Sequence, residues 1–396
     1  MTLLVDLTYP ASWQSLPLSL LARRCWHDAM AGRLDGRAHW LSLADARGSA
    51  LVGLPAVLVT DPHAYGYGNL RTLVADAGSP FATPAVRAAL HRLPPVPPAD
   101  LLPNLIITHP GYATFPVGPG RADRDALRRL LAETVGWAGA AGASAVALPY
   151  TEAGGPLATA AAEAGFRAIP LTSDAYLDVP PGGFGEYLSR QSAHRRRRLA
   201  AERRHLARSG LHVRLVASID AELLGRMAQL RARHRAKYGL PADVGAERRR
   251  LGRLIRSLGS LASAVVVEGA GGHPVCFALQ ALDGDTWHEV CCGTDYDDPR
   301  SRYAYFEATC YTPVEAAAER GIRRISFGVG AEEAKLRRGA RLVPLTCLTL
   351  GLTPAAVAAL DAVATAWAPA DRLAGGPADG SAGLTAGGPA DGGRAP

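Results

Sequence analysis

The sequence predicts an α/β protein built from two modules in tandem. Its 396 residues suit two domains of ordinary size, each with enough chain to bury a hydrophobic core. Strand-like and helix-like segments alternate along most of the chain, which is typical of α/β folds. The best candidate for a linker, Pro180–Gly183, separates an N-terminal module at 1–179 from a C-terminal module at 180–367.

The first module is expected to mix helices and strands. Pro17 suits the first turn of a helix, and Gly165 suits the residue that follows one. Apolar runs rich in Leu, Ile and Val favour strands. The helices are expected at 18–30, 124–141 and 157–164, and the strands at 51–60, 102–112, 144–149 and 166–177.

The second module contains a marked β-meander. Asp283–Asp285 reads Asp-Gly-Asp between two strand-like runs, a strong signal for a hairpin. Thr312–Glu315, with Pro313, fits a capping box that would break the preceding helix. Strands are expected at 211–217, 263–268, 275–282, 287–294, 324–328 and 343–349, and helices at 187–208, 220–238, 246–258 and between 299 and 321.

Composition excludes several classes of protein. With 48% hydrophobic and 20% charged residues the chain is too apolar for wholesale disorder. Asp6 and the absence of a basic start argue against a signal peptide, and prolines interrupt the longest uncharged stretch, Leu342–Leu360, so we expect a cytoplasmic protein without a membrane span. The six cysteines lack CxxC spacing, which predicts reduced thiols and no metal site. The tail at 368–396, rich in Gly, Pro and Ala, is expected to be disordered.

The net charge of +7 suits an anionic partner such as nucleic acid, the phosphates of coenzyme A or a nucleotide-linked substrate. Only Lys237 and Lys335 are lysines among the 43 basic residues. Either these two were kept for a compact, titratable ammonium that arginine cannot provide, or they are chance survivors in an arginine-rich chain.

The segment Phe306–Pro344, FEATCYTPVEAAAERGIRRISFGVGAEEAKLRRGARLVP, resembles the C-terminal signature of the FemAB-like acyltransferases of the GNAT superfamily. Gly293–Tyr296, Gln191–Gly210 and Pro103–Tyr112 are also similar to that family. The resemblance implies two tandem GNAT-like modules of Fem type, with mixed, largely antiparallel sheets flanked by helices. It also implies acyl transfer with aminoacyl-tRNA or acyl-CoA as co-substrate and no tightly bound cofactor.

Acyl transfer to an amine needs a group that stabilises the oxyanion and a base that accepts the amine's proton. Lys335 is the favoured oxyanion partner, and Arg338 suits a phosphate or carboxylate. Glu332 and Glu333 are candidate bases. His288 and Glu289 are the alternatives, of which strand alternation lets only one face the cleft. The non-catalytic alternative is that the charged residues near Lys335 form a solvated turn held by salt bridges.

The remaining candidates would bind substrate. Gly328 and Gly330 offer close backbone approach to a ligand, or simply form a loop that needs positive φ. Aromatic residues are expected to wall the acceptor pocket, although such residues more often belong to a core. These aromatic candidates are Tyr238, Tyr303, Tyr305 and Phe306.

The basic block His194–Arg208 is a candidate landing surface for tRNA phosphates, with Arg195, Arg198 and Arg203 as the contacts. Its alternative is a solvated helix paired with acids such as Glu202. Four consecutive arginines spread over roughly 300° of a helix, so they cannot form one stripe. The strand 275–282 is not followed by a Q/R-x-x-G-x-G/A pyrophosphate loop, which disfavours a standard CoA site.

The first hypothesis is therefore transfer of an aminoacyl or acyl group to the amine of a small molecule or a cell-wall or peptide precursor, with aminoacyl-tRNA favoured slightly as donor. The second is an acyl-CoA-dependent N-acyltransferase. The third is a non-catalytic nucleic-acid-binding protein that uses 195–208. Under the first, Lys335→Ala should lower turnover by about tenfold or more without unfolding the protein.

Overall fold

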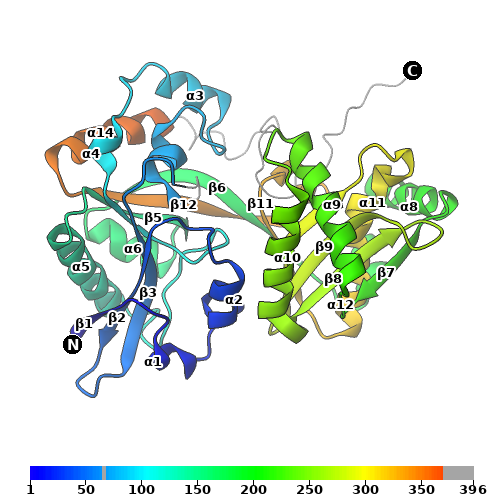
Figure 1. The fold of residues 1–396 in the computed structure, drawn as a ribbon, viewed down its shortest axis with the longest axis horizontal. Coiled ribbons are helices and arrows are strands. Elements are labelled where there is room, and N and C mark those ends of the chain that lie inside the picture. Colours follow the sequence, from blue (N-terminus) through cyan, green and yellow to red (C-terminus); the bar gives the residue numbers. More distant parts are fainter. Residues whose placement is uncertain (65–67, 369–396) are drawn as a thin grey trace. The chain divides into compact units, whose positions relative to one another are not determined.

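The structure, a computed structural model, describes residues 1–64 and 68–368 (Figure 1). It confirms an α/β fold of mixed, largely antiparallel sheets flanked by helices. The chain divides into two compact units. The first contains Met1–Ser173 and the segment that starts at Val343, and the second contains Asp174–Leu342. Apart from Ala368, the predicted disordered tail lies outside the described residues.

The first unit contains a sheet with the strand order β1-β2-β3-β4-β5-β12-β6, in which β4 and β5 are parallel. Its core lies between the sheet and two helices, α5 and α6. The elements are β1 (Thr2–Asp6), α1 (Ala11–Gln14), η1 (Leu20–Ala22), α2 (Arg24–Ala29), β2 (Arg37–Ala44), β3 (Ala50–Val59), η3 (Arg71–Ala75), α3 (Pro84–Leu90), α4 (Pro98–Leu101), β4 (Asn104–Ile107), α5 (Arg124–Ala140), β5 (Ala145–Glu152), α6 (Pro156–Glu163), β6 (Arg167–Asp178), β12 (Arg341–Gly351) and α14 (Pro354–Trp367).

The C-terminal segment differs from the prediction, which placed it in the second module. β12 pairs antiparallel with β5, so the first unit gains a strand from the far end of the chain. α14 packs on α3 and α4, where the Trp367 indole donates a hydrogen bond of 2.7 Å to the Val74 carbonyl. Burial of that large side chain, 1% exposed, holds the segment on the first unit.

The second unit contains the strand order β6-β11-β10-β9-β8-β7, in which β10 and β11 are parallel. The predicted meander is confirmed as β8, β9 and β10, with Gly284 at positive φ in the turn. The elements are α7 (Gly183–Ser189), α8 (Ala193–Arg208), β7 (His212–Val216), α9 (Ala221–Lys237), α10 (Val244–Leu258), η4 (Gly259–Leu261), β8 (Ala262–Glu268), β9 (Pro274–Asp283), β10 (Thr286–Thr294), η5 (Pro299–Tyr303), α11 (Ala304–Phe306), η6 (Glu307–Tyr311), α12 (Thr312–Glu319), β11 (Arg324–Val329) and α13 (Glu332–Leu336).

Two helix predictions in this unit were wrong in detail. The single helix expected at 187–208 is two helices, because the Ser192 hydroxyl accepts a hydrogen bond from the Arg195 amide at 3.3 Å and starts α8. Conversely, Thr312 does not break the helix that precedes it. Its hydroxyl donates to Glu307 at 2.8 Å, and helical backbone continues through the π-helical turn η6 into α12.

Helices cover both faces of the sheet in the second unit. α9 lies against β10 so closely that a Cβ at Gly293 would come within 2.7 Å of the Arg231 amide nitrogen. The neighbouring Cys292 faces the other side, in a cluster with Leu206 of α8 and Tyr305 of α11. In Figure 1, α9 and α10 lie together on the near side of this sheet.

Candidate active site

The parallel strands β10 and β11 separate partway along their length. They pair only from Thr286–His288 opposite Arg324–Ser326. Beyond that point β10 carries an irregularity between Glu289 and Cys291, and β11 carries one between Ser326 and Gly328. Such bulges re-aim side chains and often lie beside active sites. The separation therefore opens the sheet at Glu289.

Glu289 is the carboxylate at this separation. The residue is partly accessible, but its Oε1 is buried and has no hydrogen-bond partner among the described residues. Burial raises the pKa of this carboxyl to about 8, against the opposing pull of the Lys335 and Arg231 cations. A carboxyl group that titrates near neutral pH can accept a proton from a reacting amine.

Arg231 brings a cation from α9 to the same place. It is 3% exposed, and its guanidinium donates one hydrogen bond, Nη1 to the Cys292 carbonyl at 2.9 Å. Its Nε is buried and has no partner within residues 1–64 and 68–368. A buried N–H without an acceptor beside a carboxylate is suited to bind a carbonyl oxygen that becomes negative during a reaction.

Lys335 lies in α13, 7% exposed, and its ammonium donates three hydrogen bonds to consecutive carbonyls of β11. The acceptors are Phe327 at 3.0 Å, Gly328 at 2.9 Å and Val329 at 3.1 Å. Three donated bonds require the charged form, although burial lowers the pKa of this lysine. Because every proton is already used, the ammonium fixes the end of β11 in this structure and has none left for an oxyanion.

The backbone after β11 has the shape that this ammonium requires. Gly328 and Gly330 have φ of 70° and 79°, and Ala331 has φ of 52°. A residue other than glycine in this region is strained. The positive φ angles at Gly328 and Gly330 orient the carbonyls that the Lys335 ammonium binds, so the two predicted glycines shape the chain around the lysine.

The other predicted bases have different surroundings from Glu289. Glu333 is exposed and pairs with Arg337 one helical turn later, as in the solvated alternative. Glu332 lies within electrostatic reach of Lys335. His288 precedes Glu289 on the strand, so it points to the opposite face, where its Nε2 lies 3.8 Å from an Asp283 oxygen.

Arg338 and the predicted aromatic wall belong mainly to the packing around α8. The Arg338 guanidinium lies 3.0 Å from the ring centre of Phe306 and 3.8 Å from buried Glu202. Tyr303 packs edge-on against His205 of α8, 5.2 Å between ring centres. Tyr305 is buried beside Cys292 and senses the charge of Glu289, so it is the member of this group nearest the separated strands.

Tyr238 belongs to a second aromatic group at the end of α9. Its hydroxyl interacts with Tyr296, whose own hydroxyl is 3.0 Å from Nδ1 of His234. Burial, with Arg231 and Lys237 nearby, lowers the pKa of His234 to about 3, so this ring is neutral. The Lys237 ammonium lies 3.6 Å from the ring centre of Tyr296 and 5.8 Å from that of Tyr238.

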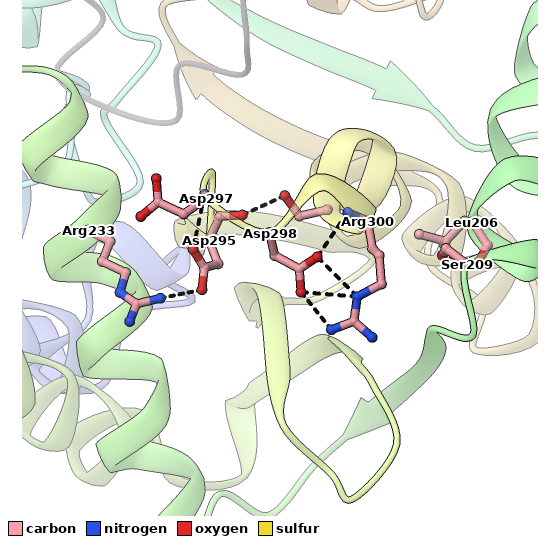
Figure 2. A network of polar contacts seen from close by, with 8 residues as sticks. Leu206, Ser209, Arg233, Asp295, Asp297, Asp298 and Arg300 are labelled. Atoms are coloured by element: carbon pink, nitrogen blue, oxygen red, sulfur yellow. Dashed lines mark hydrogen bonds and ion pairs between the residues drawn. The ribbon is translucent and has the colours of Figure 1, made fainter.

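The loop after β10 is acidic and fastened by its own ion pairs (Figure 2). Asp295 pairs with Arg233 of α9, and Asp298 accepts hydrogen bonds from the Arg300 amide at 2.9 Å and its guanidinium at 2.7 Å. Asp297 is exposed beside them. The amide that starts the following helical segment is thus already bonded to a carboxylate and is not free for a phosphate.

The predicted contacts for nucleic acid are largely occupied. Arg203 makes ion pairs with Glu307 at 2.7 Å and Glu315 at 2.6 Å, and Arg198 lies 3.2 Å from Glu202. Arg195 bonds the Gln191 side chain at 3.4 Å. Arg203 thus fastens α8 to η6 and α12, whereas Arg198 and Arg195 bond within α8 or just before it. Pairing with acids is the alternative that the sequence left open.

Other arginines of α8 are available instead. Arg197, Arg204 and Arg208 are exposed, and no ion pair or hydrogen bond of their side chains is found in the described part of the chain. Positions 7 and 11 residues apart lie within about 20° of one another on a helix, so the three form one row about 16 Å long. We call them the α8 arginine row.

Sequence reasoning missed Arg231 and the α8 arginine row. Arg231, His234 and Tyr238 recur at helical spacing with the buried Met227, so polar residues at core positions of α9 were the available signal. The α8 arginine row is periodic as well, but choosing it over Arg195, Arg198 and Arg203 requires knowing where Glu202 and Glu307 lie.

Comparison with known proteins shows what the second unit and the fold are similar to. Residues 193–336 match the family model described as Acetyltransferase (GNAT) domain. The fold is similar to that of FemX, with 12% identity over 87% of this chain and 97% of that chain and a TM-score of 0.55. It is also similar to L-PGS from Bacillus licheniformis, with 12% identity over 85% and 91% and a TM-score of 0.52. No curated protein sequence matches.

Within the described residues, every helix is too short or too polar to span a lipid bilayer.

Proposed function

We propose that this acyltransferase, whose residues 193–336 match a GNAT acetyltransferase domain, transfers an aminoacyl group from aminoacyl-tRNA to an amine. The acceptor is a small molecule or a peptide or cell-wall precursor. Glu289 takes the proton of the attacking ammonium, and the Nε–H of Arg231 binds the carbonyl oxygen. The nitrogen–carbon bond forms as the ester bond breaks, and the second proton that the attacking nitrogen loses goes to the leaving hydroxyl oxygen.

The observation that carries this proposal is the pair of buried, unpartnered polar atoms, Glu289 Oε1 and Arg231 Nε, beside the separated strands. One is a base and the other a fixed donor, the two groups that aminolysis of an ester requires. Unpartnered buried groups are costly, and their retention is expected at a site that a substrate completes.

The choice of donor rests on charge. A CoA-type pyrophosphate is usually bound by free amides at a helix start, yet here Asp298 occupies the Arg300 amide and two more aspartates lie nearby. The α8 arginine row offers three guanidinium groups for the phosphates of an RNA instead. An acyl-CoA donor remains the second candidate, because the matched family model is described as an acetyltransferase.

The row predicts a salt-sensitive contact with tRNA. Replacing Arg197, Arg204 and Arg208 by Gln should weaken tRNA binding. The negative slope of log K against log salt should become shallower by about 2 to 3, because each lost phosphate contact removes about 0.7 to 0.9 from its magnitude. Filter binding between 50 and 200 mM salt measures the slope.

A matched control is the triple change of Arg248, Arg249 and Arg256 to Gln on α10, which removes the same charge from another exposed helix. An equal loss from both triples would mean that only the overall charge attracts RNA. Full activity without tRNA binding would favour the acyl-CoA donor, whereas tRNA binding without any transfer would favour the non-catalytic alternative.

The pH dependence follows from Glu289. Because burial raises its pKa to about 8, the reactive carboxylate is a minority at pH 7 and grows as the pH rises. With the acceptor amine in large excess, we expect kcat/KM for the aminoacyl donor to increase with pH and to level off above about 8. In Glu289→Asp the midpoint should shift, and a midpoint unaffected by that change would assign the titration to another group.

A further inference from the structure

Lys237 rests against an aromatic pair at the surface of the second unit. Its ammonium lies 3.6 Å from the ring centre of Tyr296 and 5.8 Å from that of Tyr238. No carboxylate pairs with it in the part of the chain that the structure describes. The residue is exposed, whereas both tyrosines are partly buried, so the rings hold one side of the ammonium while the other faces solvent.

The aromatic pair adjoins the candidate active site. Cys292 lies within electrostatic reach of Glu289 and Arg231, and it also affects both tyrosines. Burial raises the pKa of Tyr305, and electrostatic interaction with Glu289, Tyr296 and Tyr238 raises it further. The pair and the base therefore share their neighbours.

Most of the charged groups around this pair are already engaged. Arg233 pairs with Asp295, Arg235 with Glu247 and Arg231 with the Cys292 carbonyl, while His234 is neutral. Apart from the exposed carboxylate of Asp297, which follows Tyr296 in the chain, the faces of Tyr296 and Tyr238 are thus the groups that attract a cation here. Aromatic faces bind alkylammonium ions through the negative face of the ring and favour them over uncharged molecules of similar shape.

We propose that the Tyr238–Tyr296 pair binds the alkylammonium group of the acceptor, and that Lys237 occupies it in the free protein as an internal competitor. This inference rests on the proposed function, since it names an aliphatic primary ammonium as the acceptor class. A tethered lysine acts at a millimolar effective concentration, so weakly bound amines must displace it before they reach Glu289. Lys237 thus sets a threshold for the acceptor.

The test measures binding, so that it does not depend on turnover or on the donor. Calorimetric titration of the full chain with n-butylammonium chloride should give at least about fivefold tighter binding to Lys237→Ala than to the wild type. Lys237→Arg keeps a cation over the ring and should bind as the wild type does. Adding Tyr296→Leu to Lys237→Ala should remove the gain.

Three results would overturn the inference. They are equal binding to Lys237→Ala and wild type, a gain that persists after Tyr296→Leu, and an equal gain for uncharged n-butanol, which would indicate only an apolar hole. Circular dichroism confirms that each variant is folded. The proposed function fails separately, if Glu289→Gln retains full transfer activity whatever n-butylammonium does.

Discussion

Glu289→Gln should lower kcat by about 100-fold or more while the protein stays folded. General-base catalysis contributes about 10² to 10⁴ in rate, and a glutamine of the same shape cannot accept the proton of the ammonium. The change also removes a carboxyl whose ionised form is disfavoured by burial, so the fold loses little. Transfer of a radiolabelled aminoacyl group under saturating acceptor measures the effect.

His288→Gln is the matched control, because the neighbouring side chain leaves on the opposite face of β10. It should keep transfer within about threefold of the wild type. The assignment of the base reverses if His288→Gln is the inactive variant, and it is lost if neither change affects kcat.

Lys335→Met should destabilise the protein strongly. The change leaves three buried carbonyls without their donor and removes a cation that acts on the Glu289 and Asp174 carboxyls. Removing one member of such a buried charged network costs about 3 to 5 kcal/mol in the free energy of unfolding. Urea unfolding followed by circular dichroism measures the shift of the midpoint.

The other lysine is the natural comparison. Lys237→Met removes an exposed ammonium that rests on the rings of Tyr296 and Tyr238, a contact worth about 1 kcal/mol or less at an exposed site. This contrast departs from the sequence-based expectation of a tenfold turnover loss with an intact fold. If Lys335→Met unfolds at the wild-type midpoint and only turnover drops, the original assignment of Lys335 to the oxyanion is correct.

Local signals predicted much of the fold. The Asp-Gly turn and the alternating runs on either side located the meander of β8 to β10, because hairpin turns depend on neighbouring residues alone. The partner of β12 was not predictable in this way. Its apolar pattern suits any buried strand position, and β5 lies about 200 residues earlier in the chain.

The candidate site shows the same division. Strand alternation predicted that only one of His288 and Glu289 faces the cleft. Which of the two does so depends on the irregularity in β10. The retained Lys335 was noticed from composition, whereas its three carbonyl acceptors arise from the positive φ angles after β11. Assigning the catalytic base therefore requires the distances between helices and strands, which the sequence pattern within each element does not give.

The place of β12 between β5 and β6 has a consequence for biosynthesis. A ribosome releases every strand of the second unit, as far as Val329 of β11, before β12 emerges. Until then the first unit has an open edge at β5, and exposed strand edges invite pairing with other chains. The sheet of the second unit can therefore be completed before that of the first unit. The nascent first unit keeps an incomplete sheet until β12 is synthesised.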